Sequence, residues 1–197
     1  MSYGSVRPPH WSEVWILGGG PSAKDFDLSR AYGHTVLAVN DGALRHYKET
    51  EYVCGREKFT AAFCSIDPYW IREHMTFLAW FRGERFLAPA LDTHPECKRI
   101  AGATYLKREH HFGLSEDPSV VCTGGNSGYA AINVAYHKRA EVIHLVGFDM
   151  NGPEDKYRQW VPRFRTVLPQ LEKRGTTVIN ENPESAIDAF EKREVYA

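Results

Sequence analysis

The stretch Glu13-Val14-Trp15-Ile16-Leu17-Gly18-Gly19-Gly20-Pro21-Ser22 decides the fold of this chain. An apolar run leads directly into consecutive glycines, which is the pattern of a buried strand that ends in a tight turn. Glycine permits positive φ angles and lets a ligand approach the backbone closely. Because ligands of open α/β sheets bind at the carboxyl ends of the strands, this turn predicts one wall of a binding site.

Similar apolar runs recur along the chain, with helical stretches between them. The predicted strands cover residues 13–17, 35–40, 59–66, 84–87, 103–106, 120–122, 142–148 and 176–179. The predicted helices cover residues 28–32, 68–81, 127–138, 157–174 and 183–192. Continuously apolar strands are buried on both faces, and their alternation with helices is typical of parallel sheets. The sequence therefore predicts an α/β fold: a single domain over residues 1–197, built on one doubly wound, mainly parallel, Rossmann-like sheet with helices on both faces.

Composition and charge exclude several classes of protein. The chain has 197 residues, of which 43% are hydrophobic and 25% are charged, and its formal net charge is −1. This balance supports a packed core and gives no bulk attraction to nucleic acid or to an anionic membrane, although a local basic groove stays open. The longest apolar run is too short to span a bilayer, and the first residues lack the apolar core of a signal peptide. We expect a cytoplasmic protein with a small-molecule partner, and a homodimer stays open.

The four cysteines indicate neither a metal site nor a disulfide framework. Their spacing does not match a zinc ribbon, and no secretory signal accompanies them. Cys64 and Cys122 fall in predicted strands and are interpreted as small buried apolar residues. A catalytic thiol is the less favoured alternative.

A second glycine-rich turn, Thr123-Gly124-Gly125-Asn126-Ser127-Gly128, follows the run 120–122 and opens a predicted helix. Asn126 or Ser127 is a good N-cap, and a helix N-terminus behind a glycine loop is a ready site for an anion. Each glycine loop taken alone is also compatible with a turn that binds no ligand. Together, the two loops predict a nucleotide held between two strand ends, with Asn40 at the end of a third strand.

The first glycine loop also fits another interpretation. The string Gly18-x-Gly20-x-x-Ala23, followed by Asp41 about 20 residues on, matches the dinucleotide fingerprint of NAD-binding proteins. That fingerprint requires a long helix that starts inside the glycines, whereas Pro21 and Ser22 interrupt the turn here. A NAD-binding oxidoreductase is therefore kept as an alternative.

Asp41, Asp67 and Asp149 each follow a predicted strand. Carboxylates that meet at one mouth are suited to Mg²⁺ or to a ribose hydroxyl, and Asp67 with Asp149 is the pair expected to bind Mg²⁺ if the protein depends on it. Each could instead cap the following helix, most of all Asp67, because Pro68 is favoured at a first helical position. Tyr157 follows Asp149 in a segment that could close on a phosphate.

The order of these motifs resembles a known family. Gly18-x-Gly20-Pro21-Ser22, Val39-Asn40, Asn126-Ser127-Gly128 and Gly147-Phe148-Asp149 are similar to motifs of the bacterial sialyltransferases that use CMP-sialic acid. They are equally similar to those of the archaeal hydroxymethyldihydropterin diphosphokinases and their phage-encoded relatives. The similarity covers most of residues 13–149. It implies a nucleotide or nucleotide sugar as substrate, with Mg²⁺ on the diphosphokinase side, and leaves the acceptor open.

The resemblance also implies roles for particular residues. Asn40 would orient the donor, and Ser127 with Gly128 would hold the nucleotide end. The family's histidine base has no counterpart after Asp149, so the irregular segment 93–118 is expected to supply one, with His111 or its neighbour His110 as the candidate and Asp149 as the second catalytic residue. The expected nucleotide-binding residues are Gly18, Gly19, Gly20, Pro21, Ser22, Asn40, Asp41, Thr123, Gly124, Asn126, Ser127, Gly128 and Tyr157.

These observations predict a nucleotide-dependent transferase. It would move a glycosyl group from a CMP-sugar-like donor, or a diphosphoryl group from ATP, to a small hydroxyl acceptor. A catalytically inactive nucleotide-binding module is a further alternative. The substitutions Ser127→Ala and Gly20→Val are each expected to weaken nucleotide binding without unfolding the chain.

Overall fold

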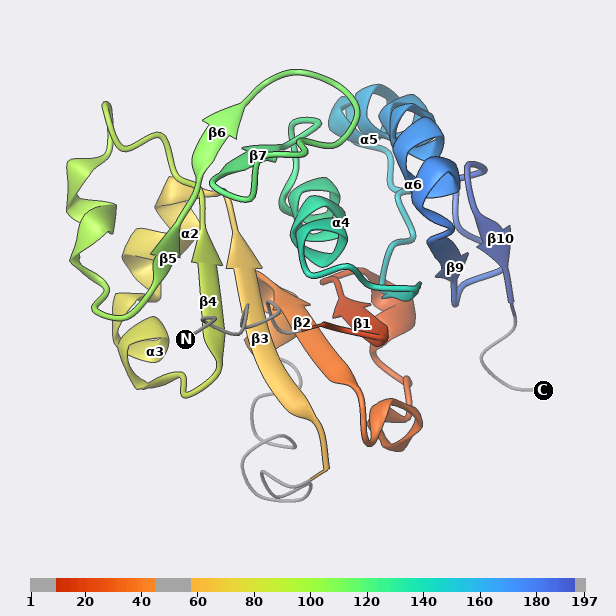
Figure 1. Ribbon diagram of the computed structural model, residues 1–197, viewed down its shortest axis with the longest axis horizontal. Helices are drawn as coiled ribbons and strands as arrows, with labels where there is room; N and C mark the ends of the chain where they lie inside the picture. Colours follow the sequence, from red (N-terminus) through yellow and green to blue (C-terminus); the bar gives the residue numbers. More distant parts are fainter. Residues whose placement is uncertain (1–9, 45–57, 194–197) are drawn as a thin grey trace, which may run out of the picture.

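The computed structural model describes residues 10–44 and 58–193 and arranges them around one long sheet (Figure 1). Its strands lie in the order β10-β9-β8-β1-β2-β3-β4-β5, and the pairs of neighbours are parallel. Apart from their end residues, the predicted strands of this sheet are confirmed. They are β1 (Glu13–Leu17), β2 (Thr35–Val39), β3 (Thr60–Ser65), β4 (Glu84–Leu87), β5 (Thr104–Tyr105), β8 (Val142–Val146) and β9 (Thr177–Asn180). The eighth strand, β10 (Glu191–Lys192), was not predicted and lies at the end of a segment predicted to be helical.

The chain extends the sheet in two directions from β1. It first runs through β2, β3 and β4 to β5, and it then returns to β8, which lies on the other side of β1. The direction of winding therefore reverses between β1 and β8, where Trp15 pairs in register with His144. In doubly wound sheets the ligand crevice opens at such a switch point, outside the carboxyl ends of the strands. The residues after Leu17 and after Val146 stand at this position.

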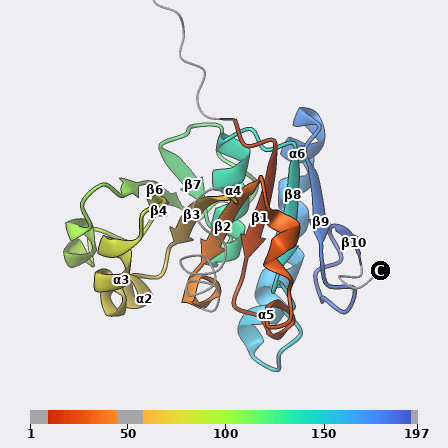
Figure 2. The ribbon, with the colours of Figure 1, turned by 90° about the horizontal axis from the view of Figure 1, so that it is seen from below.

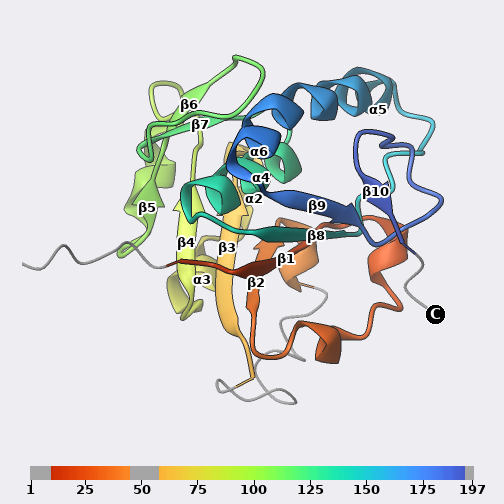
Figure 3. The same cartoon turned by 45° about the vertical axis from the view of Figure 1, so that its right-hand side comes forward.

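Helices cover both faces of the sheet, which confirms the predicted doubly wound architecture. Val14 and Ile16 of β1 belong to the core under α4 (Ser127–His137), η4 (Val161–Val167) and α6 (Leu168–Arg174). Trp15 and Leu17 point to the opposite face, which carries η1 (Pro21–Ala23), η2 (Leu28–Ala31), α2 (Pro68–Glu73), α3 (Met75–Trp80) and η3 (Pro95–Arg99). Figure 3 shows α4 and α6 together beside β8 and β9, and Figure 2 shows α2 and α3 away from them.

A second, two-stranded sheet stands beside the first. It pairs β6 (Lys107–Glu109) with β7 (Val120–Cys122) in parallel, and Arg108 lies opposite Val121. The irregular segment predicted over residues 93–118 therefore contains η3, β5 and β6. Because β7 leads into the turn that starts at Thr123, this small sheet fixes the approach to α4.

Two predicted helices are broken into shorter ones. The predicted helix over residues 68–81 is interrupted at His74. The ring nitrogen Nδ1 of His74 lies 2.9 Å from the carbonyl oxygen of Trp70, which also accepts the helical hydrogen bond from the His74 amide. The stretch 157–174 becomes α5 (Asp155–Trp160), η4 and α6, because Pro162 and Pro169 lack the N–H that a continuous helix needs. None of the helices in the described ranges is long and apolar enough to cross a membrane.

The helix predicted over residues 183–192 is wrong. The segment is irregular and ends in β10, and its backbone is bonded to other parts of the chain. The amide of Ala186 donates to the Asp149 carbonyl, and the amide of Glu184 donates to the Asn182 side chain. The hydroxyl of Ser185 donates to the Phe148 carbonyl at 2.5 Å. These bonds replace the helical ones and tie the segment to the exit of β8.

Two of the predicted buried cysteines are confirmed. Cys64 and Cys122 are buried in β3 and β7. Burial raises the pKa of the Cys64 thiol to about 12, so this thiol stays protonated at neutral pH and is a poor nucleophile. Cys54 lies outside the described residues.

Candidate functional site

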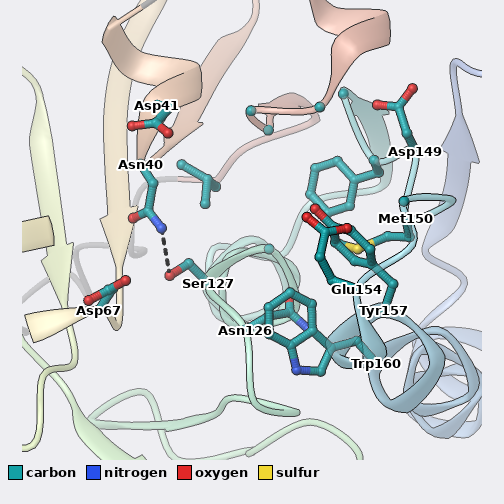
Figure 4. Close-up of a pocket in the computed structure, with 18 of the residues that line it drawn as sticks. Asn40, Asp41, Asp67, Asn126, Ser127, Asp149, Met150, Glu154, Tyr157 and Trp160 are labelled. Carbon is teal, nitrogen blue, oxygen red and sulfur yellow. Dashed lines mark hydrogen bonds between the residues drawn. The ribbon is translucent and has the colours of Figure 1, made fainter. Parts of the chain in front are cut away.

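A pocket of about 710 Å³ opens at the carboxyl ends of β1, β2, β3 and β8, at the switch point of the sheet (Figure 4). Its other walls are the start of α4 and the segment 150–160, which includes α5. Two distant parts of the predicted site meet here: the glycine turn after β1 and the helix start after the second glycine turn. The pocket thus stands where the sequence predicts a ligand.

Most of the predicted binding residues line this pocket. They are Gly18, Gly19, Gly20, Pro21, Asn40, Asp41, Asp67, Asn126, Ser127, Gly128, Asp149 and Tyr157. Four predicted residues, Ser22, Thr123, Gly124 and His111, do not line it, and the same holds for His110. Both histidines are exposed on the segment between β6 and β7.

The first glycine turn uses most of its backbone amides within the protein. The amide of Gly18 donates to the Val146 carbonyl at 2.7 Å, and that of Gly20 donates to the Gly147 carbonyl at 3.0 Å. Among the described residues, the Gly19 amide has no hydrogen-bond partner, so it is the one amide of this turn that a ligand could use. The turn therefore joins the exits of β1 and β8 and offers less to a phosphate than its composition suggests.

Asp149 holds this turn in place. Its carboxylate accepts hydrogen bonds from the Ser22 hydroxyl at 3.0 Å, the Ser22 amide at 3.2 Å and the Asn182 side chain at 2.9 Å. The residue is 8% exposed. Figure 4 shows its carboxylate directed away from Asn40 and Ser127. The side chain predicted to be catalytic thus has its acceptor sites occupied by the scaffold.

Gly20 is required for this packing. A Cβ atom at Gly20 would overlap the carboxylate of Asp149 and would lie 2.5 Å from the carbonyl oxygen of Gly147. A Cβ atom at Gly19 would instead meet the Asp41 Cβ at 3.4 Å, which is ordinary contact. A valine at Gly20 would therefore require the Gly147 backbone and the Asp149 side chain to shift, so we expect Gly20→Val to destabilise the fold.

The second glycine turn presents the N-terminus of α4 to the pocket. The Asn126 side-chain oxygen accepts from the Tyr129 amide at 2.8 Å and so caps this eleven-residue helix, as predicted. The amides of Ser127 and Gly128 have no helical carbonyl to bond, because they precede the first complete turn. They line the pocket together with the positive end of the helix dipole.

The Ser127 hydroxyl bonds to the ends of two neighbouring strands. It accepts hydrogen bonds from the Ile66 amide after β3 at 3.1 Å and from the Asn40 side chain after β2 at 3.4 Å (Figure 4). A hydroxyl has one proton to donate. With its oxygen accepting from two protein donors, Ser127 can direct that proton to an acceptor on a ligand.

Thr123 and Gly124 support the turn from behind. The Thr123 hydroxyl accepts from the Gly125 amide at 3.3 Å, and the Gly124 carbonyl accepts from Arg163 at 2.9 Å. Gly124 has a φ of 50°, and a Cβ there would collide with the ring of Tyr129. These two residues shape the site without lining the pocket.

Three buried polar atoms around the pocket have no hydrogen-bond partner in the described part of the chain. They are the Nδ2 of Asn126, the Nε of Arg108 and the Oδ1 of Asn40. Asn126 is 6% exposed. Buried polar groups are normally bonded, so such atoms beside a pocket are suited to a ligand. The Asn126 and Arg108 nitrogens are hydrogen-bond donors, as are the amides of Ser127 and Gly128 at the start of α4.

Arg108 was missed by the sequence reasoning. It comes from β6, inside the segment predicted to be irregular, and it lines the pocket close to Asp67. Burial lowers the pKa of the Arg108 guanidinium, and the Asp67 carboxylate opposes that effect. The local signal was slight, since Lys-Arg-Glu shows no strand pattern by itself and acquires one through pairing with β7.

The carboxylates of Asp41, Asp67 and Asp149 do not converge. Asp67 caps α2, accepting from the amides of Tyr69 at 2.9 Å and Trp70 at 3.2 Å, and Asp41 accepts from the Trp70 indole at 2.8 Å. Among the described residues, no group of three or more acidic, histidine or cysteine side chains could hold a metal ion.

The wall opposite Asn40 is aromatic. Tyr157 and Trp160 of α5 line the pocket with their rings 5.8 Å apart, and Lys156 lies 5.1 Å from the first ring and 5.8 Å from the second. Glu154 lines the same side, and among the described residues its carboxylate has no hydrogen-bond partner. Figure 4 shows it next to Met150 and Tyr157. This wall combines flat rings with a free carboxylate.

Comparison with known proteins gives no assignment. No known protein family matches the sequence, and no curated protein matches it. A solved structure described as "Cellulomonas fimi endo-beta-1,4-mannanase double mutant" is 9% identical, and the similarity covers 87% of this chain and 56% of that one with a TM-score of 0.24. The chain thus spans a little over half of that protein's length. A likeness at this score carries no argument about function.

Proposed function

We propose that the pocket binds the nucleotide part of a donor and that the protein transfers a group from this donor to a small hydroxyl acceptor. The observation that supports this most is the set of free donors at the start of α4. The amides of Ser127 and Gly128, the Ser127 proton and the Asn126 Nδ2 belong to one helix start. Such a set favours an anion, and phosphate is the anion that helix N-termini commonly bind.

The size and the walls of the pocket suit a nucleotide. Sites for small ligands commonly measure roughly 300–1,000 Å³, and this pocket of 710 Å³ lies within that range. The rings of Tyr157 and Trp160 provide flat apolar surface on which a base or sugar can stack. The unpaired oxygen of Asn40 is an acceptor for an amino or hydroxyl group of the ligand.

The chemistry of transfer needs charge stabilisation and a base. Arg108 and the N-terminus of α4 would stabilise negative charge on the leaving phosphate. We place the base at Glu154 rather than His111, because Glu154 lines the pocket with a free carboxylate. It would accept the proton of the acceptor hydroxyl as that oxygen attacks the donor. Asp149 would act by positioning the first glycine turn.

The two donor classes differ in their need for metal. A nucleoside triphosphate carries Mg²⁺ on its phosphates, usually with one or two protein carboxylates, and Asp41 and Asp67 line the pocket for such a bound ion. A CMP-sugar-like donor needs no such ion. Ligand binding with and without Mg²⁺ separates the two classes, because the triphosphate would bind more weakly without the ion and the CMP-sugar-like donor would not. The NAD alternative gains no support, because η1 is three residues long and Asp41 is bonded to Trp70.

The test is a thermal-shift screen of nucleotides and nucleotide sugars with and without Mg²⁺, followed by calorimetry on each ligand that raises the Tm. A ligand at about 100 times its Kd stabilises the native state by about 2.7 kcal/mol. Ser127→Ala is expected to weaken binding of that ligand about tenfold. The control is Ser119→Ala, whose hydroxyl bonds Asp117 on the exposed turn before β7.

Activity separates an enzyme from a binding module. Donor hydrolysis by the wild type that falls at least a hundredfold in Glu154→Gln, with unchanged nucleotide affinity, supports the proposed base. Tight nucleotide binding with no turnover of any donor would instead support the inactive module. Absence of a Tm shift with every nucleotide would refute the proposal.

A further inference from the structure

A row of aromatic side chains and cations continues the aromatic wall out of the pocket, with Phe112 and Lys156 exposed and Tyr157, Trp160 and Arg163 half-buried. Phe112, which is 59% exposed, carries the guanidinium of Arg163 at 5.6 Å from its ring. Arg163 also donates to the Gly124 carbonyl, and a Cβ at Gly125 would lie 2.5 Å from Arg163 and 3.2 Å from the Trp160 indole nitrogen. Arg163 therefore lies beside Phe112 on one side and near Gly125 on the other, and Trp160 also lies near Gly125.

The row ends at α5. Trp160 contacts Tyr157 edge to face, and Lys156 lies near both rings. We call this set the aromatic ridge: Phe112, Lys156, Tyr157, Trp160 and Arg163. Tyr157 and Trp160 line the pocket, whereas Phe112, Lys156 and Arg163 lie outside it.

A matching pair stands on the opposite rim. Tyr69 of α2 lines the pocket and is 58% exposed, and Arg72 lies 5.4 Å from its ring. His94 contacts the same ring edge to face at 5.3 Å. Both rims of the pocket therefore combine an exposed aromatic ring with a cation.

We propose that the aromatic ridge binds single-stranded nucleic acid and that a hydroxyl group of this strand, in place of a small molecule, is the acceptor at the pocket. Bases stack on exposed aromatic rings, and each phosphate between them carries a negative charge for a neighbouring cation. The ridge offers both kinds of group side by side, since Lys156 lies near Tyr157 and Trp160 and Arg163 lies near Phe112. The role as acceptor rests on the proposed function, whereas the binding itself does not.

The cations decide between a nucleic acid and a neutral carbohydrate. A sugar ring also stacks on aromatic side chains, but it has no charge for Lys156, Arg163 or Arg72 to meet. The net charge of −1 of the whole chain does not oppose this inference. A short nucleic-acid strand contacts only the aromatic ridge and its cations, so the local charge matters more than the total. The net charge does predict modest affinity that falls steeply with salt.

The experiment measures fluorescence anisotropy of labelled twelve-nucleotide strands, one of deoxyuridine and one of uridine, on the full chain. Phe112→Ala is expected to weaken binding about tenfold, because it removes a ring on which a base stacks. Lys156→Ala is expected to weaken binding by a similar factor, because it removes a cation that a phosphate would meet. The control is Trp80→Ala, because Trp80 is 70% exposed but ends α3 just before β4 begins, at the other end of the sheet. Comparison of the two strands shows whether the 2′-hydroxyl matters.

The outcomes separate this inference from the proposed function. A mononucleotide Tm shift that Phe112→Ala leaves unchanged, together with loss of strand binding, supports both. The same Tm shift with no strand bound more tightly than about 100 µM overturns the ridge and leaves the nucleotide site standing. Equal losses in Trp80→Ala and Phe112→Ala, or a neutral oligosaccharide that binds as well as the strand, would also overturn it.

Discussion

The Ser22 hydroxyl donates a hydrogen bond of 3.0 Å to the carboxylate of Asp149, and the two residues are 127 positions apart in the sequence. The bond joins the turn after β1 to the exit of β8, across the switch point of the sheet. Asn182, from the segment after β9, donates to the same carboxylate at 2.9 Å. One buried side chain thus fixes three separate loops at the mouth of the pocket.

Asp149→Asn tests this structural role. An asparagine keeps the shape but turns one acceptor into a donor, which would face the donors of Ser22 or Asn182. Leaving such a buried donor unpaired costs about 1–3 kcal/mol, so we expect the free energy of unfolding in urea to fall by that amount. The control is Asp67→Asn, since Asn caps a helix about as well as Asp and should change stability little. A fully stable Asp149→Asn protein that has lost catalysis would show that the residue is catalytic.

Gly20→Ala and Gly19→Ala form a matched pair in the first glycine turn. The added methyl group collides with Asp149 and Gly147 in the first variant and meets only ordinary contacts in the second. We expect Gly20→Ala to lower the Tm strongly and Gly19→Ala to unfold close to the wild type, as measured by circular dichroism on heating. Equal Tm values in the two variants would mean that the turn is loose enough to accept a side chain at either position.

The fold could be predicted from the sequence because its signals are local. The central strands β1, β2 and β8 are largely apolar, and Gly18 and Gly147 mark where β1 and β8 end. The segment 183–192 shows the limit of this reasoning. Its composition suits a helix, but Ser185 and Ala186 bond to Phe148 and Asp149, which are distant in sequence. Partners of this kind cannot be read from a local pattern.

The candidate site could also be predicted from local signals, but only as far as the position of its residues at the strand ends. Asn40 and Ser127 follow strand ends and lie together as their positions indicate. Whether a polar residue faces the pocket or serves the scaffold depends on tertiary contacts. Asp149 is bonded to Ser22 and Asn182, while Arg108 reaches the pocket because β6 pairs with β7. The residues next to Asp149 and Arg108 in the sequence therefore predict neither the structural role of Asp149 nor the position of Arg108 in the pocket.

Arg108→Gln tests the buried cation of the pocket. Its Nε has no partner, so a phosphate oxygen would gain a charge-assisted hydrogen bond there. We expect calorimetry to show about tenfold weaker binding of the nucleotide identified in the screen and unchanged binding of the corresponding nucleoside. Lys107→Ala is the control, because Lys107 is exposed on the same strand and paired with Glu109. An equal loss for nucleotide and nucleoside would place the phosphate away from Arg108.

The pH dependence of stability tests the role of Glu181. This residue follows β9 directly and precedes Asn182 in the sequence. Burial raises the pKa of its carboxyl, but the hydrogen bond with His144 at 2.7 Å and the charge of Arg30 at 3.1 Å outweigh burial, and the pKa of Glu181 is lowered. The unfolded chain takes up this proton near the ordinary value of 4.5, before the folded chain does. The stabilisation is therefore complete above that pH and is lost as the pH falls through the lowered folded value.

Glu181→Gln is accordingly expected to be less stable than the wild type at pH 7, with a difference that shrinks as the pH falls below about 4.5. Urea unfolding followed at pH steps between 7 and 3 measures both curves, with Glu184→Gln as a control at an exposed carboxyl nearby. The partner groups that face Glu181 are Arg30 and His144, and His144 in turn lies 3.4 Å from Glu13. A difference between Glu181→Gln and the wild type that stays constant over the whole range would show that the lost interaction does not depend on the charge of the carboxylate.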